Sequence, residues 1–172
     1  MDLNSIRTEI DRVDKQLMEL LKERFALVEG VAEYKRENNL PVYAPEREKQ
    51  ILNRVGRQDS GGLPPEGLKL LFGIIMDLNK LNEYRITPKK LEVPTGMGGA
   101  SVRAILPGSP GALCRYLSAL AAAEVYLSNI SSTTLPGGKL AVDMELHGKT
   151  DDPKFMAALS VLSDTAEQFM LL

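Results

Sequence analysis

The first 37 residues carry the feature that most constrains the fold, which is a pair of apolar series with a period of seven. The two series contain Leu3, Ile10, Leu17 and Val31, and Ile6, Val13, Leu20 and Leu27. This period predicts one long α-helix with an apolar stripe, ended by Leu40-Pro41. At 1.5 Å per residue, 35 residues form a rod of roughly 50 Å, which is longer than a small domain is wide. Such a rod extends past the body of its own protomer, so we predict a homodimer.

Two shorter helices follow. Pro45 suits a first helical position and acidic residues follow it, which predicts a helix that ends before the turn at 59–62. A third helix is predicted from about Pro65 to Arg85. Its expected inward face contains Leu68, Leu71, Phe72, Ile75, Leu78 and Leu81. Residues 86–100 then lose all periodicity and contain several Pro and Gly residues, which indicates a linker.

Beyond the linker the apolar period changes to two, as in Val102, Ala104 and Leu106. We predict a strand there, a helix to about residue 123, strands at 126–134 and 139–147, a helix at 152–163 and a strand at 168–172. This βαββαβ order implies an antiparallel sheet with both helices on one face, the ferredoxin-like arrangement. The expected fold class is therefore α plus α+β, with a helical domain at 1–86, a linker at 87–100 and a second domain at 101–172.

The composition excludes several kinds of chemistry. A net charge of −2 and a pI near 5.6 argue against general nucleic-acid binding. The single cysteine, Cys114, cannot form an intrachain disulfide, and the single histidine, His147, cannot anchor a metal cluster. The sequence has no apolar run near 18 residues and no signal-peptide pattern. We expect a cytoplasmic protein without metal, cofactor, membrane or nucleic acid.

Several cations lie on or beside the apolar faces of the predicted helices. Arg24 takes the place between Leu17 and Val31 in its series, and Arg47 stands one turn before Ile51. Arg7 and Lys35 flank the same stripe as Arg24, and in the third helix the apolar face continues into Asn79 and Glu83.

Any single one of these residues fits an ordinary role, because a long side chain can extend to water or pair with Glu83. The whole set does not, because a buried, unpaired cation costs several kcal/mol. Glu48 and Glu83 are too few to neutralise four cations. The sequence therefore predicts a small ligand with more than one carboxylate.

Residues 1 to about 86 resemble the all-helical class of chorismate mutase, in which a long helix and two shorter ones intertwine in a dimer. The resemblance is carried by Ile6-Arg7 with Asp14, Leu20-Leu21-Lys22-Glu23-Arg24, Val31-Ala32-Glu33-Tyr34-Lys35, Pro45-Glu46-Arg47-Glu48 and Asn79-Lys80-Leu81-Asn82-Glu83. It implies conversion of chorismate to prephenate, in the shikimate pathway of phenylalanine and tyrosine biosynthesis.

The resemblance also implies a role for each matching residue. Arg24 and Arg47 would hold the substrate carboxylates, and Arg7 would reach in from the other protomer. Lys35 would donate to the ether oxygen and to a carboxylate, and Glu48 would accept from the ring hydroxyl. Asn79 stands where the family often has serine, Glu83 where it has glutamine or glutamate, and Ala44 where some members have aspartate.

The chemistry fits such a set of residues. The reaction is a one-molecule pericyclic Claisen rearrangement, which needs no nucleophile, metal or cofactor. Catalysis consists of holding the substrate in a reactive geometry and stabilising charge on the breaking ether oxygen. Glu83 must be protonated to donate to that oxygen; burial favours the protonated form and nearby cations oppose it. We therefore predict activity that falls as the pH rises above neutrality.

The second half resembles an ACT domain, a βαββαβ module that senses amino acids in biosynthetic enzymes. The segment Ser109-Pro110-Gly111-Ala112-Leu113-Cys114 matches a Gly-Ala-Leu segment of aromatic-pathway relatives. Where phenylalanine-binding relatives have Glu-Ser-Arg-Pro, this chain has Ser131-Ser132-Thr133-Thr134. The resemblance implies allosteric regulation by an aromatic amino acid. The implied effector site contains Ser109, Gly111, Ala112, Leu113 and Ser132.

Other functions remain open at this stage. Isochorismate pyruvate lyase uses a similar cationic pocket, and a non-catalytic amino-acid-sensing dimer would share both halves. The second half could also serve only in assembly, and ACT pairing would raise the dimer to a higher oligomer. Dehydratase activity is not expected, because about 15 linker residues stand where bifunctional relatives have a whole domain.

Overall fold

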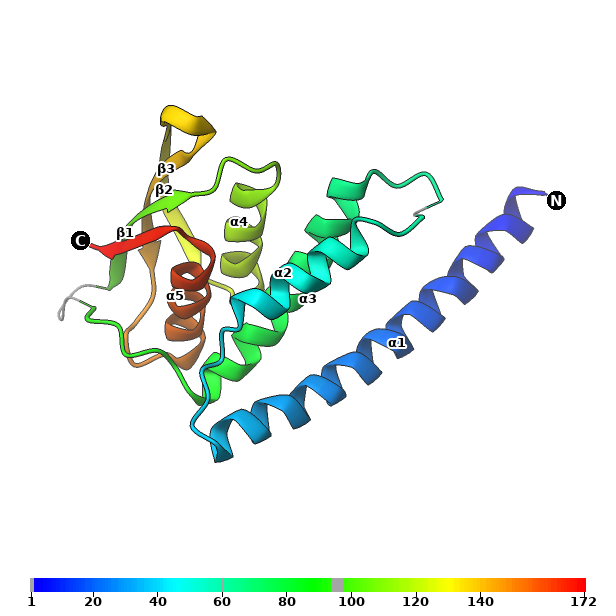
Figure 1. Cartoon of the computed structure of the whole chain (residues 1–172), viewed down its shortest axis with the longest axis horizontal. Coiled ribbons are helices and arrows are strands. Elements are labelled where there is room, and N and C mark those ends of the chain that lie inside the picture. Colours follow the sequence, from blue (N-terminus) through cyan, green and yellow to red (C-terminus); the bar gives the residue numbers. More distant parts are fainter. Residues whose placement is uncertain (1, 60, 94–97) are drawn as a thin grey trace. The chain divides into compact units, whose positions relative to one another are not determined.

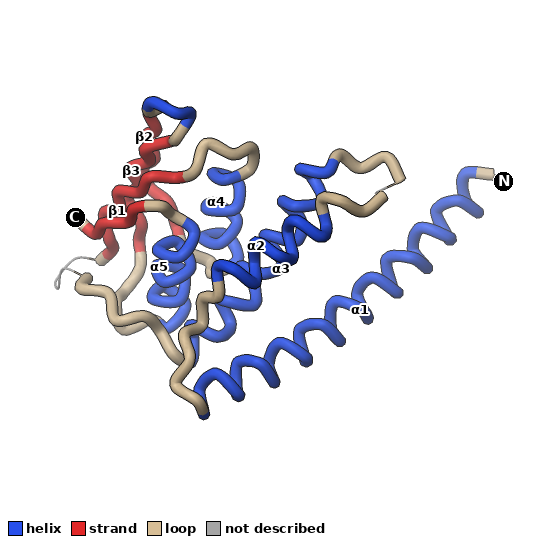
Figure 2. The backbone as a smooth tube through the Cα atoms, in the orientation of Figure 1, coloured by secondary structure: helices blue, strands red, loops and turns tan. Residues whose placement is uncertain are grey.

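The computed structural model describes residues 2–59, 61–93 and 98–172 of the chain (Figures 1 and 2). Contacts divide the chain into two compact units, Met1–Pro41 and Val42–Leu172. The second and third helices therefore belong to the same unit as the C-terminal sheet. The domain limits expected at 86 and 101 stay a prediction. Among the described helices, none is both long enough and apolar enough to cross a membrane.

The first unit is built around one helix, α1 (Leu3–Glu37), which confirms the helix expected from the heptad pattern. The side chain of Asp2 caps its first turn by accepting a hydrogen bond from the Ser5 amide at 2.9 Å. The apolar side chains of the stripe are exposed, from 42% for Ile6 to 68% for Leu27. A single helix has no core of its own, so this face lacks the cover that its sequence pattern calls for.

Helices α2 (Pro45–Val55) and α3 (Pro65–Ile86) begin at the expected prolines. Val55 is fully buried at the end of α2. The prediction for α3 was wrong in one respect, because Leu71 is 50% exposed. The buried face of α3 passes through Gly73, Lys80 and Tyr84, and Leu71 lies about 200° round the helix from Gly73.

The C-terminal elements confirm the predicted βαββαβ order. They are β1 (Gly99–Leu106), α4 (Ala112–Ala122), β2 (Tyr126–Thr134), β3 (Leu140–His147), α5 (Pro153–Thr165) and β4 (Gln168–Leu171), with a 3₁₀ turn at Pro136–Gly138. The strands form one antiparallel sheet in the order β2-β3-β1-β4. Strand β1 begins at Gly99, so its first two residues lie within the stretch expected as linker. Residues 94–97 of the expected linker lie outside the described residues.

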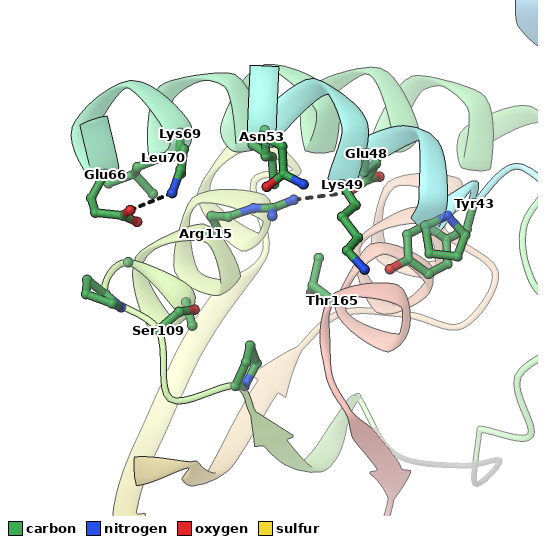
Figure 3. A pocket seen from close by; sticks show the side chains of 16 residues that line it. Tyr43, Glu48, Lys49, Asn53, Glu66, Lys69, Leu70, Ser109, Arg115 and Thr165 are labelled. Atoms are coloured by element: carbon green, nitrogen blue, oxygen red, sulfur yellow. Dashed lines mark hydrogen bonds and ion pairs between the residues drawn. The ribbon is translucent and has the colours of Figure 1, made fainter. Parts of the chain in front are cut away.

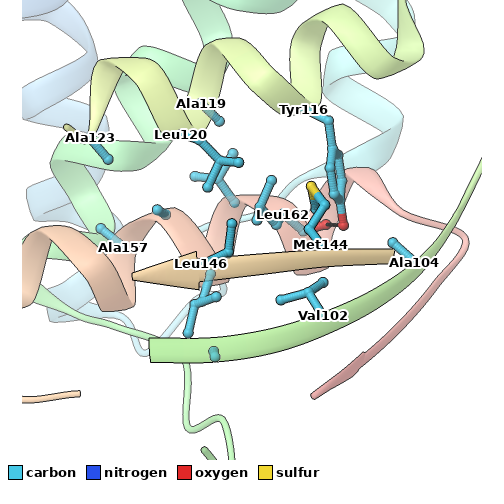
Figure 4. Close-up of a cluster of buried hydrophobic side chains, with 14 of the residues drawn as sticks. Val102, Ala104, Tyr116, Ala119, Leu120, Ala123, Met144, Leu146, Ala157 and Leu162 are labelled. Carbon is cyan, nitrogen blue, oxygen red and sulfur yellow. Dashed lines mark hydrogen bonds between the residues drawn. The ribbon is translucent and has the colours of Figure 1, made fainter. Parts of the chain in front are cut away.

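Helices α4 and α5 cover one face of this sheet (Figure 4). Alternate residues of β1 and β3 point toward them and are buried, as the period of two requires. Tyr116 and Phe155 are the largest fully buried side chains of the two helices, and the Tyr116 hydroxyl donates to the carbonyl oxygen of Leu162 at 2.9 Å. Strand β2 is at the edge of the sheet and is mostly exposed.

Helix α3 packs on the other side of α4 and α5, so the second unit has three layers (Figures 1 and 2). Leu81 and Tyr84 of α3 belong to the same buried cluster as the inward residues of the sheet. The Tyr84 hydroxyl donates to Asp164 Oδ2 at 2.6 Å, and Lys89 Nζ forms an ion pair with the same carboxylate. Helix α3 and the sheet of the second half therefore share one core.

Candidate active site and an adjoining cavity

The residues predicted to bind substrate are divided among three helices. On α1, Arg7 is exposed, whereas Arg24 and Lys35 are half-buried. Arg24 and Lys35 are 11 positions apart, which places them on nearly the same face about 16 Å apart along the axis. Lys35 lies 28 positions after Arg7, or about 42 Å along the helix. One small molecule cannot contact both Arg7 and Lys35 of the same α1.

The Arg24 guanidinium is incompletely hydrogen-bonded within the described part of the chain. Its Nη1 atom is buried and has no hydrogen-bond partner among the described residues. Burial lowers the pKa of Arg24 from its ordinary value, although an arginine stays charged. A buried donor without an acceptor costs free energy, and an anionic acceptor would remove that cost.

On α2, the two adjacent candidates have different surroundings. Arg47 is exposed, and its Nη1 donates to Gln50 Oε1 at 3.4 Å. Glu48 is half-buried, and its Oε1 lies 2.8 Å from Lys80 Nζ of α3. Glu48 therefore already has a cationic partner within the chain, which the sequence analysis did not foresee.

On α3, Asn79 and Glu83 are buried, with 6% and 8% exposure. They are four positions apart, so they lie one turn from each other on one face of the helix. The Asn79 side-chain amide donates to the carbonyl oxygen of Ile75 at 2.8 Å. One of its donors is thus used within its own helix, and its carbonyl oxygen is the group suited to accept from a ligand.

Glu48 belongs to a buried cluster of four charges that joins the two halves of the chain. Lys80 Nζ lies 3.0 Å from Asp77 Oδ1, in addition to its contact with Glu48. Arg115 of α4 grips Asp77 with two hydrogen bonds, from Nε to Oδ2 at 2.9 Å and from Nη2 to Oδ1 at 2.7 Å. Arg115 Nη2 also lies 3.6 Å from Glu48 Oε2. Two carboxylates and two cations therefore balance one another.

The cluster shifts the pKa values of its cations. Burial would lower the pKa of Lys80, but Asp77 and Glu48 raise it above its ordinary value. Burial opposes charge on Arg115 in the same way, and its bonds to Asp77 raise its pKa. Lys80 Nζ also lies 4.9 Å from the centre of the Tyr43 ring, a cation–π contact. Both cations therefore stay charged despite burial.

The sequence contained one signal for this cluster. Asp77 interrupts the apolar stretch between Phe72 and Leu81, so a buried partner could have been expected. Nothing local identified that partner as Arg115, which is 38 positions away. The Arg115 side chain of α4 packs directly against Gly73 of α3. A Cβ atom on Gly73 would lie 2.8 Å from Arg115 Nε.

A cavity of about 420 Å³ lies beside the cluster, between α2, the start of α3 and the loop that leads into α4 (Figure 3). Three residues of the predicted effector site, Ser109, Gly111 and Ala112, line it. The other two do not: Leu113 packs partly against the hydrophobic core, and Ser132 is exposed on β2. Both halves of the chain thus contribute to its walls.

Gly111 is required at the point where the loop meets α3. Its φ of +84° is in the left-handed region, which favours glycine. A Cβ atom there would also lie 3.1 Å from Leu70 Cδ1 of α3. The glycine therefore allows the loop to approach α3 and shapes the cavity.

These features define a class of protein: three helices that carry several cations, followed by a ferredoxin-like α+β sheet. A family model described as chorismate mutase type II matches residues 6–84. All seven residues predicted for the mutase site lie within this span. A chorismate mutase from Methanocaldococcus jannaschii is 34% identical over 79 residues, which cover 45% of this chain and 80% of that protein. The chain belongs to the chorismate mutase type II family.

Other similar proteins are longer. A bifunctional chorismate mutase/prephenate dehydratase from Aquifex aeolicus is 38% identical over 68 residues, which cover 38% of this chain but 19% of that protein. The match thus spans about a fifth of this relative. A solved prephenate dehydratase in complex with L-Phe from Arthrobacter aurescens overlaps 49% of this chain and 29% of its own, with a TM-score of 0.39 and 24% identity.

Proposed function

We propose that this protein is a chorismate mutase that converts chorismate to prephenate. The observation that carries the proposal is the family segment at 6–84, which contains every residue expected to contact the substrate. The buried, unpaired Nη1 of Arg24 supports it, because a substrate carboxylate is the kind of acceptor that this atom lacks.

In this proposal catalysis is electrostatic. Arg24 and Arg47 hold the two carboxylates, which brings the enolpyruvyl group over the ring. Lys35 and Glu83 donate to the ether oxygen as its bond to the ring breaks, and they stabilise the charge that develops there. Asn79 supplies a further hydrogen bond on the same face of α3 as Glu83.

In this proposal Glu48 contacts both Lys80 and the ring hydroxyl of the substrate. Lys80 holds one of its oxygens, and the other is 3.6 Å from Arg115, beyond a good hydrogen bond. A carboxylate oxygen accepts more than one bond, so Glu48 can still accept from the ring hydroxyl of the substrate. Lys80 then fixes the orientation of the carboxylate before the substrate arrives.

We further propose that the active form is a homodimer that completes each site with Arg7 of the second copy. The separation of about 42 Å between Arg7 and Lys35 supports this, because one helix cannot bring both to one substrate. The exposed stripe of α1 supplies an apolar surface for the second copy. Pairing of the C-terminal sheets would give a higher oligomer, and we expect the enzyme in the cytoplasm.

The C-terminal half is proposed to regulate the enzyme by binding an aromatic amino acid. Its ferredoxin-like fold is the one expected of an ACT-like domain. The predicted effector residues Ser109, Gly111 and Ala112 line a cavity, which supports ligand binding at that segment.

The test is an assay of the purified protein with chorismate and, separately, with isochorismate, followed by NMR of the products. We expect prephenate from chorismate and no pyruvate from isochorismate. Arg24→Ala should lower kcat/KM by orders of magnitude without unfolding the protein. Arg12→Ala is the matched control on the same helix, because Arg12 is exposed and contacts Glu9 and Gln16.

Two results would contradict the proposal. Pyruvate from isochorismate with no prephenate from chorismate would identify a lyase. An Arg24→Ala variant that retains every measurable function would favour a non-catalytic sensor.

A further inference from the structure

Helix α4 of the C-terminal half places one cation in the charge cluster around Glu48. Arg115 lies one turn after the start of α4 at Ala112, and its side chain is 19% exposed. Its Nη2 atom is 2.7 Å from Asp77 Oδ1 and 3.6 Å from Glu48 Oε2, and Figure 3 marks the contact with Glu48. Arg115 therefore connects the C-terminal half of the chain to a residue of the proposed mutase site.

The two carboxylate oxygens of Glu48 face different cations. Oε1 lies 2.8 Å from Lys80 Nζ of α3, and Oε2 faces Arg115 of α4. The last torsion angle of a glutamate side chain is broad, so a carboxylate held at one oxygen can still rotate. A cation beside each oxygen restricts this rotation, and the Glu48 side chain is 16% exposed, which limits screening of the charges by water.

Asp77 holds both of the cations that face Glu48. Its Oδ1 lies 3.0 Å from Lys80 Nζ, and its two oxygens accept from Nη2 and Nε of Arg115 at 2.7 and 2.9 Å. Such a bidentate pair fixes the plane of the guanidinium as well as its position. The Asp77 side chain is 3% exposed, so this support is buried beneath Glu48's two partners.

We infer that Arg115 is a positioning residue of the mutase, supplied by the sheet domain. It holds the Glu48 carboxylate in the orientation that accepts from the ring hydroxyl of the substrate, and it acts through Glu48 without contacting the substrate. The inference rests on the proposed function, in which Glu48 binds that hydroxyl. The helical segment that matches the mutase family then depends on α4 for its full affinity for chorismate.

This role predicts a particular kinetic change. The ring hydroxyl takes no part in the bonds that form or break, so its hydrogen bond to Glu48 is present in the substrate and in the transition state alike. Weakening such an interaction raises KM and leaves kcat nearly unchanged. A residue with only a structural role acts differently, because loss of folded protein lowers the apparent kcat and leaves KM unchanged.

The experiment is a steady-state mutase assay of the full chain and its variants. For Arg115→Met we expect KM to rise about tenfold, because a displacement of about 1 Å in a positioned group can cost up to about a hundredfold. Arg115→Lys keeps a cation and should recover part of this loss. Arg103→Met is the matched control, because Arg103 also donates two hydrogen bonds to one carboxylate, Asp143, but is exposed. Its KM should equal that of the wild type.

A second variant displaces Arg115 without removing a charge. A Cβ atom on Gly73 would lie 2.8 Å from Arg115 Nε, so the guanidinium must move in Gly73→Ala. Alanine favours a helix over glycine, so this variant should fold and still show a raised KM. Gly67→Ala is its control on the same helix, because the nearest contact there is an ordinary 3.5 Å to Pro64 Cγ.

A double-mutant cycle tests whether Arg115 acts through Glu48. Glu48→Gln removes the charge that Arg115 faces, so adding Arg115→Met to it should raise KM little further. An Arg115→Met variant that raises KM by the same factor in both backgrounds would overturn the inference.

The inference is also overturned if Gly73→Ala and Arg115→Met both have the KM of the wild type. If Arg115→Met does not fold, Gly73→Ala decides the question alone. These results in a wild type that makes prephenate contradict the role of Arg115 and leave the mutase proposal standing. A wild type that makes no prephenate contradicts the mutase proposal itself, and the role of Arg115 with it.

Discussion

Helix α1 and the unit at 42–172 differ in the burial of their apolar side chains and in the pairing of their buried charges. On α1 the apolar stripe is exposed, Ala32 is the one buried residue of the helix, and the Arg24 guanidinium has a buried donor that no described residue accepts from. In the second unit the apolar residues form a closed core, and buried charges such as Lys80 and Asp77 face each other. The first unit does not cover its own apolar face, whereas the second unit buries its apolar residues and pairs its buried charges within itself.

This difference separates two uses of a buried cation. Lys80 and Arg115 have carboxylates from the same chain beside them, so Lys80 stabilises the contact of α3 with α2, and Arg115 that of α4 with α3. Arg24 has no acceptor for its Nη1 within the described ranges, which is why we propose a substrate carboxylate for it. Arg115 and Arg24 therefore place the same chemical group in two settings, paired with Asp77 in the second unit and proposed to bind a ligand in the first.

The largest expected effect comes from breaking the stripe of α1. Leu17→Glu places a charge in the middle of the exposed apolar face, and we expect loss of the dimer and of almost all mutase activity. Sedimentation analysis measures the oligomeric state. Lys15→Glu, two positions away on the same helix, should leave the dimer intact. A monomeric variant with normal activity would show that Arg7 of the second copy is not needed.

The next largest effect is expected from breaking the buried charge cluster of the second unit. Asp77→Ala leaves Lys80 and Arg115 buried without their shared carboxylate, and we expect the free energy of unfolding to fall by about 3–5 kcal/mol. Urea denaturation followed by circular dichroism measures it. Asp143→Ala, which removes an exposed pair with Arg103, should change stability little. Equal losses in the two variants would contradict the structural role of the buried cluster.

A smaller loss is expected from Tyr84→Phe. The hydroxyl of Tyr84 donates to the buried Asp164 carboxylate, and burial together with this bond raises the pKa of Tyr84. Its removal should cost about 1–3 kcal/mol of unfolding free energy. Tyr126→Phe is the control, because Tyr126 is 79% exposed. A neutral Tyr84→Phe variant would mean that the shared core does not depend on this bond.

The smallest effect concerns pH. In the proposed mechanism Glu83 can donate to the ether oxygen only while it holds a proton, so activity should decrease several-fold as the pH rises above neutrality. Glu83→Gln donates at every pH, and its kcat/KM profile should be flatter. A wild-type profile that stays level from about pH 5 to 9 would rule out this role for Glu83.

The sequence predicted secondary structure well because periodicity is a local property. The start of α1 at Leu3, the starts of α2 and α3 at their prolines and the whole of β2 agree with the prediction. The contact of α3 with α4 and α5 was missed, because it depends on residues such as Asp77 and Arg115 that are far apart in sequence. The exposure of Leu71 and the ion pair of Glu48 with Lys80 were missed as well, because neither can be read from the local sequence.

Tyr84 and Leu81 are side chains of a mutase helix that complete the interior of the ferredoxin-like domain. A gene that encoded the helices alone would produce a protein with an exposed hydrophobic patch on α3. A gene for the sheet domain alone would leave Asp164 without the Tyr84 hydroxyl that donates to it. The two halves are consequently poor candidates for exchange by recombination. Sequence changes in α3 are therefore expected to be accompanied by compensating changes in α4 and α5.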